Sequence, residues 1–316
     1  MNGTVDRDEL RNDIREALAI GDQDFDTIIE DCVEYLHGVA EAGAVRAAAT
    51  EIAAEEFAAY RAEQKSWPDV LDTDRLIGAF RELETAGIIA RENFTCCQSC
   101  GTAEIGGEAP EGAEPRGYVF CHHQDVQAAV DGQGVHLSYG AFDGGEAAAE
   151  RIGEEVVAVL RRHGLAPEWN GAPGRRILVP MTWRRRRFGR LAAWPGGPAP
   201  EDAAPLKVTY RDYARGCGED APVPMPLAAA RRVLLDLTPR TGGFATFEGR
   251  SGAIVQVIWE DGPRLWLESP DAATRSSRGR HVTPAEAEEM IRVLADEDRA
   301  DLTRLGGLEI RPWSAD

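Results

Sequence analysis

The sequence has few cysteines, few lysines and no long apolar run. Among its 316 residues are six cysteines and two lysines, Lys65 and Lys207, and all other basic residues are arginine. A membrane-spanning helix needs roughly 18 consecutive apolar residues, so we expect no membrane partner. The acidic N-terminus has no basic stretch followed by an apolar one, which predicts no signal peptide and a cytoplasmic protein. Structural disulfides are disfavoured in that compartment.

Several motifs that carry chemistry are also missing. There is no glycine-rich phosphate-binding fingerprint and no serine or cysteine in a nucleophile elbow, which argues against nucleotide binding and against hydrolysis by those mechanisms. We find no internal repeat and no coiled coil. The sequence therefore does not decide whether the protein is an enzyme, and it favours a non-enzymatic one.

The net charge of −19 is unevenly distributed. Residues 1–92 contain 22 acidic and nine basic residues, whereas residues 181–316 contain equal numbers of both. An acidic field repels a phosphate backbone, so we expect no nucleic-acid partner. The same field is compatible with a basic protein partner.

Periodicity predicts an α+β protein: a helical N-terminal region leading into an α/β sandwich, plus a small C-terminal α+β domain. Residues 1–70 form the acidic helical region, with a break at Gly21 and Asp22. Residues 71–188 form the α/β core, in which strands are expected at 165–169 and 175–181. Residues 189–226, rich in Pro, Gly and Ala, are expected to be a connector with one short strand at LKVTY.

The C-terminal domain is expected over 227–316. The stretch AIVQVIWEDGPRLWLESP predicts a hairpin. Thr283, Pro284 and Glu286 predict the start of a helix, because they combine a capping box with proline in the first turn.

Three cysteines crowd into the stretch FTCCQSCG, where a strand is expected to end and a turn to begin. Cys97 and Cys100 have the spacing at which two sulfurs of one turn can face a zinc ion, and Cys96 offers a substitute. A second half-site is present about twenty residues later, at Cys121, His122 and His123. The alternatives are a redox dithiol, disfavoured because GTAEIGGEAP is a poor helix start, and simple packing at a tight turn.

The stretch HHQD is a second candidate site. His122 or His123 with Asp125 could form an oriented imidazole of the kind that acts as a general base. Asp125 could equally cap the helix that follows. The run WRRRRFGR, 183–190, is expected to lie against the acidic helical segment of the same molecule or to be solvated.

Residues 74–188 resemble a bacterial family of domains of unknown function. The stretches that carry the resemblance are DRLIGAFRELETAGIIARENFTCCQSCG, GYVFCHHQD, LSYGAF, IGEEVVAVLRRHGLAPEWNG and RILVPMTWRRR. The resemblance implies that His122, Gln124 and Asp125 recur while the cysteine stretch varies, which points to His122 and Asp125 rather than to an obligatory zinc site. The C-terminal unit is similar in layout to small bacterial toxin-immunity domains.

Two functions follow as hypotheses. The first is a non-enzymatic binding protein, of immunity-like character, that meets a basic partner by charge steering. The second is a zinc-binding or acid–base enzyme that uses the turn at 96–100 with His122 and Asp125. No cofactor is firmly indicated, and zinc would serve only the metal-binding form of the second hypothesis.

Overall fold

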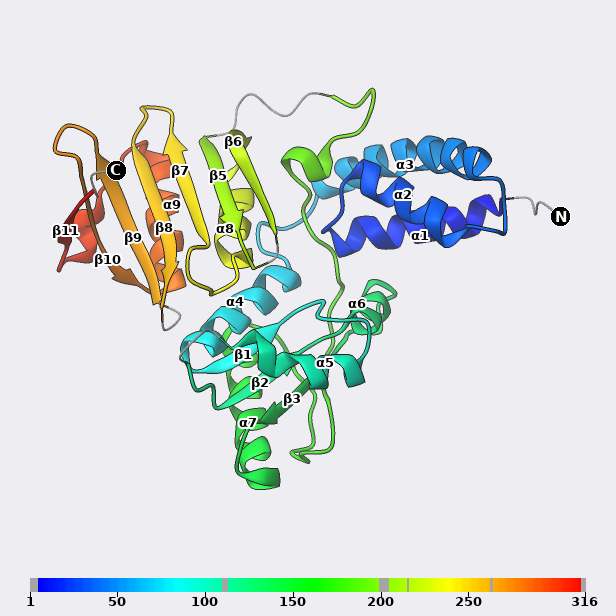
Figure 1. The fold of residues 1–316 in the computed structure, drawn as a ribbon, viewed down its shortest axis with the longest axis horizontal. Helices are drawn as coiled ribbons and strands as arrows, with labels where there is room; N and C mark the ends of the chain where they lie inside the picture. Colours follow the sequence, from blue (N-terminus) through cyan, green and yellow to red (C-terminus); the bar gives the residue numbers. More distant parts are fainter. Residues whose placement is uncertain (1–4, 110–112, 199–204, 215, 262–263, 314–316) are drawn as a thin grey trace.

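The structure is a computed structural model that describes residues 5–109, 113–198, 205–214, 216–261 and 264–313. The chain forms three parts (Figure 1): an N-terminal helical part, a middle unit built on a four-stranded sheet and a C-terminal unit built on a seven-stranded sheet. This arrangement confirms the predicted α+β fold class. Among the helices of these ranges, none combines the length and the apolar character that crossing a membrane requires.

The N-terminal part contains α1 (Arg7–Ile20), α2 (Phe25–Tyr35) and α3 (Ala42–Gln64). Each helix is preceded by an acidic side chain that accepts backbone N–H groups of the first turn: Asp6, Asp24 and Glu41. Such carboxylates satisfy otherwise unpaired donors and complement the helix dipole. Gly21 ends α1 with a φ of 83°, a left-handed conformation that costs glycine little. The break therefore falls where the sequence predicts it.

The middle unit contains a sheet whose strands lie in chain order: β1 (Ile88–Arg91), β2 (Gly117–Phe120), β3 (Val135–Ala141) and β4 (Ile177–Val179). β1 and β2 are parallel, and the other neighbours are antiparallel. The helices of the unit are α4 (Asp72–Thr85), α5 (Gln98–Glu104), α6 (His123–Val130) and α7 (Gly145–Arg162).

The two faces of this sheet differ. On one, the α4/α7 face, Ile88, Ala90 and Val119 join the main core with buried side chains of α4 and α7. On the other, the α5 face, Ile89 and Phe120 pack with one residue of the short helix η1 (Ile105–Glu108), which continues α5. Alternate residues of a strand project to opposite faces, which explains the division.

Two local predictions for the middle unit were wrong. Residues 165–169 form no strand, and Glu168 makes only a single bridge to Leu178; Pro167 has no N–H to donate to a ladder. Residues Gln98–Glu104 form α5, although the sequence predicts a poor helix start at GTAEIGGEAP. Its Gly101 is buried on the ring of Phe120, where an added Cβ would lie 2.4 Å from a ring carbon. Glycine allows this helix to approach the sheet closely.

The C-terminal unit is an antiparallel sheet in the order β11-β10-β9-β8-β7-β5-β6. Its strands are β5 (Leu206–Asp212), β6 (Cys217–Met225), β7 (Phe244–Gly249), β8 (Ile254–Glu260), β9 (Arg264–Asp271), β10 (Ser276–Val282) and β11 (Glu309–Pro312). α8 (Leu227–Asp236) and α9 (Pro284–Glu297) supply the helical side of its core. At the start of α9, Glu286 N–H donates to Thr283 Oγ1 over 3.2 Å, and Thr283 N–H donates to Glu286 over 2.7 Å, as the capping box predicts.

The connector predicted at 189–226 is largely a structured part of this unit. β5, which includes the predicted strand LKVTY, pairs with both β6 and β7, so the C-terminal unit begins at Leu206 rather than at 227. The segment that forms β6 contains prolines, so the sequence predicts an irregular segment there. Because β6 is the edge strand, prolines are tolerated there.

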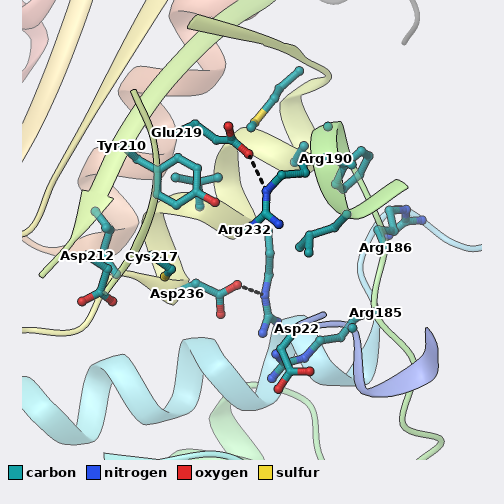
Figure 2. A pocket seen from close by; sticks show the side chains of 18 of the residues that line it. Asp22, Arg185, Arg186, Arg190, Tyr210, Asp212, Cys217, Glu219, Arg232 and Asp236 are labelled. Carbon is teal, nitrogen blue, oxygen red and sulfur yellow. Dashed lines mark hydrogen bonds and ion pairs between the residues drawn. The ribbon is translucent and has the colours of Figure 1, made fainter. Parts of the chain in front are cut away.

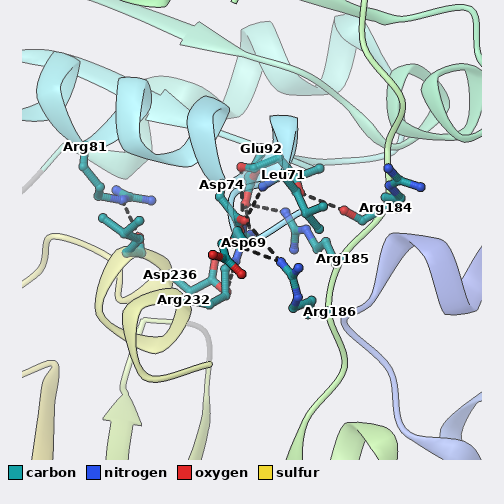
Figure 3. Close-up of polar contacts among 12 residues, drawn as sticks. Asp69, Leu71, Asp74, Arg81, Glu92, Arg184, Arg185, Arg186, Arg232 and Asp236 are labelled. Atoms are coloured by element: carbon teal, nitrogen blue, oxygen red, sulfur yellow. Dashed lines mark hydrogen bonds and ion pairs between the residues drawn. The ribbon is translucent and has the colours of Figure 1, made fainter. Parts of the chain in front are cut away.

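The arginine run contacts several parts of the molecule (Figure 3). Arg187 donates to Leu18 O of α1 over 3.2 Å, so the run does lie against the acidic helical region, one of the two expected arrangements, although Arg190 is exposed. Arg185 pairs with Glu92, and Arg186 donates to the carbonyl oxygen of Trp67 over 3.2 Å. From the C-terminal unit, Arg232 of α8 reaches the same Glu92 over 2.9 Å. Arg81 of α4 donates to a carbonyl oxygen of α8 over 2.8 Å. These buried contacts hold α4, α8 and the arginine run together.

Candidate functional site

The cysteine-bearing turn connects β1 to α5 and is fixed to the end of β2. Phe94 N–H donates to Cys121 O over 2.9 Å, and His123 N–H donates to Thr95 O over 3.0 Å. Thr95 has a φ of 58°, which marks a sharp reversal just before the thiols. The turn and the strand end, about twenty residues apart in sequence, are therefore neighbours at the backbone.

The three thiols converge. The sulfur atoms of Cys96, Cys97 and Cys100 all lie within 4.8 Å of one another, and those of Cys96 and Cys100 are 3.6 Å apart. Cys97 is the N-cap residue of α5, so Cys100 follows within the first turn. Cys96 is exposed and the other two are half-buried. The cluster could hold a metal ion and is accessible from solvent.

The thiols differ in acidity. The pKa of Cys97 is lowered, first by a hydrogen bond from the backbone of Cys100 and then by the neighbouring thiols. The pKa of Cys100 is raised to about 11, because its hydrogen bonds and charge interactions with Cys96 and Cys97 disfavour a second thiolate nearby. The cluster is therefore built to form one thiolate readily and to resist further ionisation unless a cation is present.

The remaining predicted ligands do not join the cluster, which corrects the six-residue site. Within the described residues, the group of metal-ligating side chains contains only the three cysteines. Cys121 belongs to the core on the α4/α7 face, and burial raises its pKa to about 12. His123 Nδ1 lies 3.0 Å from the side-chain oxygen of Asn93. The backbone brings the two stretches together, but their side chains turn apart.

His122 forms a different network, with Asp125 and Arg176. His122 Nε2 lies 3.0 Å from Asp125 Oδ2, and the same oxygen accepts the His122 backbone N–H over 3.1 Å. Asp125 thus acts as the third helical residue of a capping box on α6, not as the N-cap itself. Arg176, just before β4, pairs with Asp125 and donates to His136 O over 2.6 Å.

This network orients a neutral imidazole. His122 and Asp125 are each 5% exposed. Burial lowers the pKa of His122, and the positive charge of Arg176 adds to the shift, although Asp125 opposes it. His122 Nδ1 is buried and has no hydrogen-bond partner among the described residues. Sequence reasoning found His122 and Asp125 but missed Arg176; an arginine directly before an apolar strand was the available signal.

A pocket of about 390 Å³ lies where the three parts meet (Figure 2). Its arginines are already paired: Arg190 faces Glu219 at 3.9 Å, and Arg232 binds Asp236 over 2.7 Å. Because these cations are matched by carboxylates, the pocket offers no excess of either sign to a ligand. We interpret it as a polar contact region between the three parts rather than as a ligand-binding site.

An acidic groove of about 400 Å³ lies between α1, α2 and the start of α6. Four carboxylates line it: Asp13, Glu16, Asp22 and Asp31. No lysine or arginine is among the described residues that line it. Burial and the charges of Glu9 and Glu16 raise the pKa of Asp13. Tyr35, at the groove, is 72% exposed. Four carboxylates of the acidic N-terminal region therefore lie at one groove beside an exposed aromatic ring.

Comparison with known proteins identifies a family but no function. A family described as "Domain of unknown function (DUF6891)" matches residues 4–187, which is more than half of the chain. No curated protein and no solved structure matches. The match begins well before the predicted residue 74, so it takes in the N-terminal helices, and it ends inside the arginine run.

Proposed function

We propose that this chain, which belongs to the DUF6891 family, is a metal-binding protein whose thiols Cys96, Cys97 and Cys100 hold a zinc ion. The observation that carries the proposal is the convergence of three sulfurs within 4.8 Å. Zinc–sulfur bonds of about 2.3 Å in a tetrahedral site place two sulfurs about 3.8 Å apart. The 3.6 Å between Cys96 and Cys100 is close to that separation.

The donor set suits zinc and leaves one position open. Three thiolates are soft ligands of the type that zinc takes in proteins. Neither nearby histidine joins the thiols, because His122 faces Asp125 and His123 faces Asn93. The fourth ligand would then be water or a group from another molecule. Sites with three protein ligands and an open position support Lewis-acid chemistry, whereas four-ligand sites are structural.

Proton competition should govern affinity. A thiol must lose its proton to bind a metal, and the pKa of Cys100 is raised to about 11 by its sulfur neighbours. Repulsion between neighbouring thiolates keeps the Cys100 thiol protonated. A bound divalent cation offsets that repulsion by attracting each thiolate. Zinc binding is therefore expected to release protons and to weaken as the pH falls.

A dithiol is the competing use of the same residues. The objection drawn from sequence was wrong, because a helix, α5, does begin directly after Cys97. The lowered pKa of the Cys97 thiol favours attack on a disulfide. In such a step two thiols form one S–S bond, and two electrons and two protons pass to an oxidised acceptor dithiol. We propose a reducing, cytoplasmic setting, in which the thiols stay available for either role.

Elemental analysis of the protein purified under reducing conditions separates these uses. We expect about one zinc ion per chain, loss of zinc in Cys97→Ser and Cys100→Ser, and retention in Cys217→Ser, which removes a thiol outside the cluster. Equal metal content in all four proteins would contradict the proposal. Metal-free protein with an oxidisable pair among Cys96, Cys97 and Cys100, identified by mass spectrometry, would favour the dithiol instead.

A second function, binding of a basic protein partner, is favoured by the acidic groove. Opposite charge accelerates encounter and fixes orientation, and Tyr35 offers an exposed ring for contact. We expect capture of a basic protein at low salt that is lost at high salt, because screening weakens exposed charge interactions.

A control variant distinguishes an effect of the groove on capture from an effect of the overall net charge. The triple variant Asp13→Asn, Glu16→Gln, Asp31→Asn should reduce capture. A matched variant that neutralises three exposed carboxylates of α7, at Glu146, Glu150 and Glu154, should not. Equal loss in both variants would assign the effect to overall charge and remove the groove from the account.

A further inference from the structure

A small cavity on the α5 face has a lining unlike the other pockets. Its volume is about 120 Å³, and its lining includes Ser138 of β3, Arg175 and Arg176 before β4, and two residues of α5, Gln98 and Thr102. No aspartate or glutamate is among the described residues that line it. Pockets for whole cofactors or drug-sized ligands have roughly 300–1,000 Å³. This cavity has room for a single small chemical group.

Strand register explains why these side chains meet. In the β2–β3 ladder Phe120 is opposite Ser138, and in the β3–β4 ladder Leu137 is opposite Ile177. Continuing the second ladder by one residue places Arg176 beside Ser138. Residues opposite each other in a sheet project to the same face, so Ser138 and Arg176 lie with Phe120 on the α5 face.

Two residues that line this cavity each have a buried donor without an acceptor among the described residues. Ser138 is 4% exposed, and its Oγ has no hydrogen-bond partner within the described part of the chain. Arg176 Nε is buried and is likewise without a partner there. Buried polar groups in proteins are nearly always hydrogen-bonded. Because Ser138 and Arg176 line the same cavity, one acceptor group bound there could serve both donors after a small side-chain adjustment.

Charge favours an anion as that acceptor. Arg176 is paired with Asp125, but Arg175 at the rim is exposed, and no carboxylate contacts it among the described residues. Two guanidinium groups with one carboxylate leave an excess positive charge at the cavity. Arginine forks bind planar or tetrahedral oxyanions through charge-assisted hydrogen bonds.

We propose that this cavity binds one oxyanion group, a carboxylate or phosphate of a small molecule or peptide. Ser138 Oγ and Arg176 Nε are its buried donors, and Arg175 is the cation at its entrance. The α5 residues Gln98 and Thr102 also line it. The site is separate from the three thiols, and the inference does not depend on metal binding.

Calorimetric titration of the full chain with inorganic phosphate and, separately, with acetate tests the proposal, with chloride holding the ionic strength constant. One saturable site per chain is expected for at least one of the two anions, and their relative affinity identifies phosphate or carboxylate as the group. Loss of a hydrogen bond to a charged group corresponds to a roughly tenfold or larger weakening, which we expect for Ser138→Ala. Arg175→Ala, an exposed position that leaves the fold intact, should also weaken binding.

One variant serves as a control, and two results would contradict the proposal. Arg161→Ala removes another exposed arginine, on α7, and should leave affinity unchanged. The proposal is overturned if neither anion binds saturably, or if all three variants bind as the parent does, which would indicate water in the cavity and an adventitious ion only. Cys97→Ser should retain anion binding, so failure of the zinc proposal and failure of this one are distinguishable.

Discussion

The two faces of the β1–β4 sheet are made by alternate residues of the same strands but serve different purposes. The α4/α7 face is an apolar core in which Phe80, Leu83 and Val156 are fully buried. The α5 face carries the helix with Cys97 and Cys100 and the residues Ser138 and Arg176, whereas the His122 network lies at the end of β2 and the start of α6. The large apolar core lies on one side of the sheet and the solvent-accessible thiols on the other, as expected where a rigid scaffold positions a site.

The largest expected effect lies on the α4/α7 face. Phe80→Ala should lower the free energy of unfolding by about 3–5 kcal/mol, because it removes a fully buried ring and leaves a cavity. When both proteins are kept metal-free with a chelator, so that no zinc-binding energy enters, Cys100→Ser on the opposite face should change it by no more than about 0.5 kcal/mol. Urea denaturation of both variants measures the difference. Similar losses in the two would show that the faces are not divided in this way.

The next effect is on the His122 network. Asp125→Ala leaves Arg176 and His122 without their shared carboxylate, and removing one partner of a buried pair costs about 3–5 kcal/mol. Because the Arg176 side chain is 25% exposed, we expect a value near about 3 kcal/mol. The same denaturation experiment measures it. A loss below about 1 kcal/mol, the value typical of exposed pairs, would show that water replaces the carboxylate.

A smaller loss of stability is expected where α5 packs on the sheet, and zinc content should fall with it. Gly101→Ala places a Cβ against the ring of Phe120 and should destabilise the protein by about 1–3 kcal/mol, as overpacking does. We also expect it to lower zinc content, because it lifts α5 and with it Cys97 and Cys100. Gly107→Ala is the control, since no atom lies within 4 Å of its added Cβ. Unchanged zinc content in Gly101→Ala would separate the thiols from the seating of the helix.

The smallest effect is one of pH. The pKa of folded His122 lies below its ordinary value of 6.5, so below about pH 6.5 the unfolded chain binds a proton that the folded chain does not. Stability should therefore fall as the pH drops below about 6.5, until the folded pKa is reached. His122→Gln should flatten this part of the stability profile. The groups facing His122 that titrate or carry charge are Asp125, Arg176 and His123. An unchanged profile would assign the acid sensitivity to other residues.

Local signals in the sequence predicted much of the fold. Thr283 and Glu286 predicted the start of α9, and Gly21 predicted the end of α1, because caps depend on neighbouring residues alone. Tertiary context decided the failures. The prolines of β6 favour a connector when the sequence is considered alone. A strand accepts them because it lies at the sheet edge, and that position is not visible in the sequence. The stretch GTAEIGGEAP looks like a poor helix start in sequence, although its first residue, Gly101, is the one that allows α5 to approach Phe120.

The site was partly predictable for the same reason. The spacing of Cys97 and Cys100 is local, and those two thiols do converge with Cys96. Whether His122 and His123 join them depends on side-chain directions at a strand end, which one residue of shift reverses. Arg176 and Ser138 come from strands whose pairing the sequence does not reveal. Their meeting could be found only in three dimensions.

The most direct test of the central claim is X-ray absorption at the zinc edge on protein purified under reducing conditions. Three thiolates on an open site predict three sulfur neighbours at about 2.3 Å and one lighter oxygen or nitrogen neighbour. A zinc ion with only nitrogen and oxygen neighbours, or no zinc signal in protein whose thiols are reduced and unmodified, would contradict it.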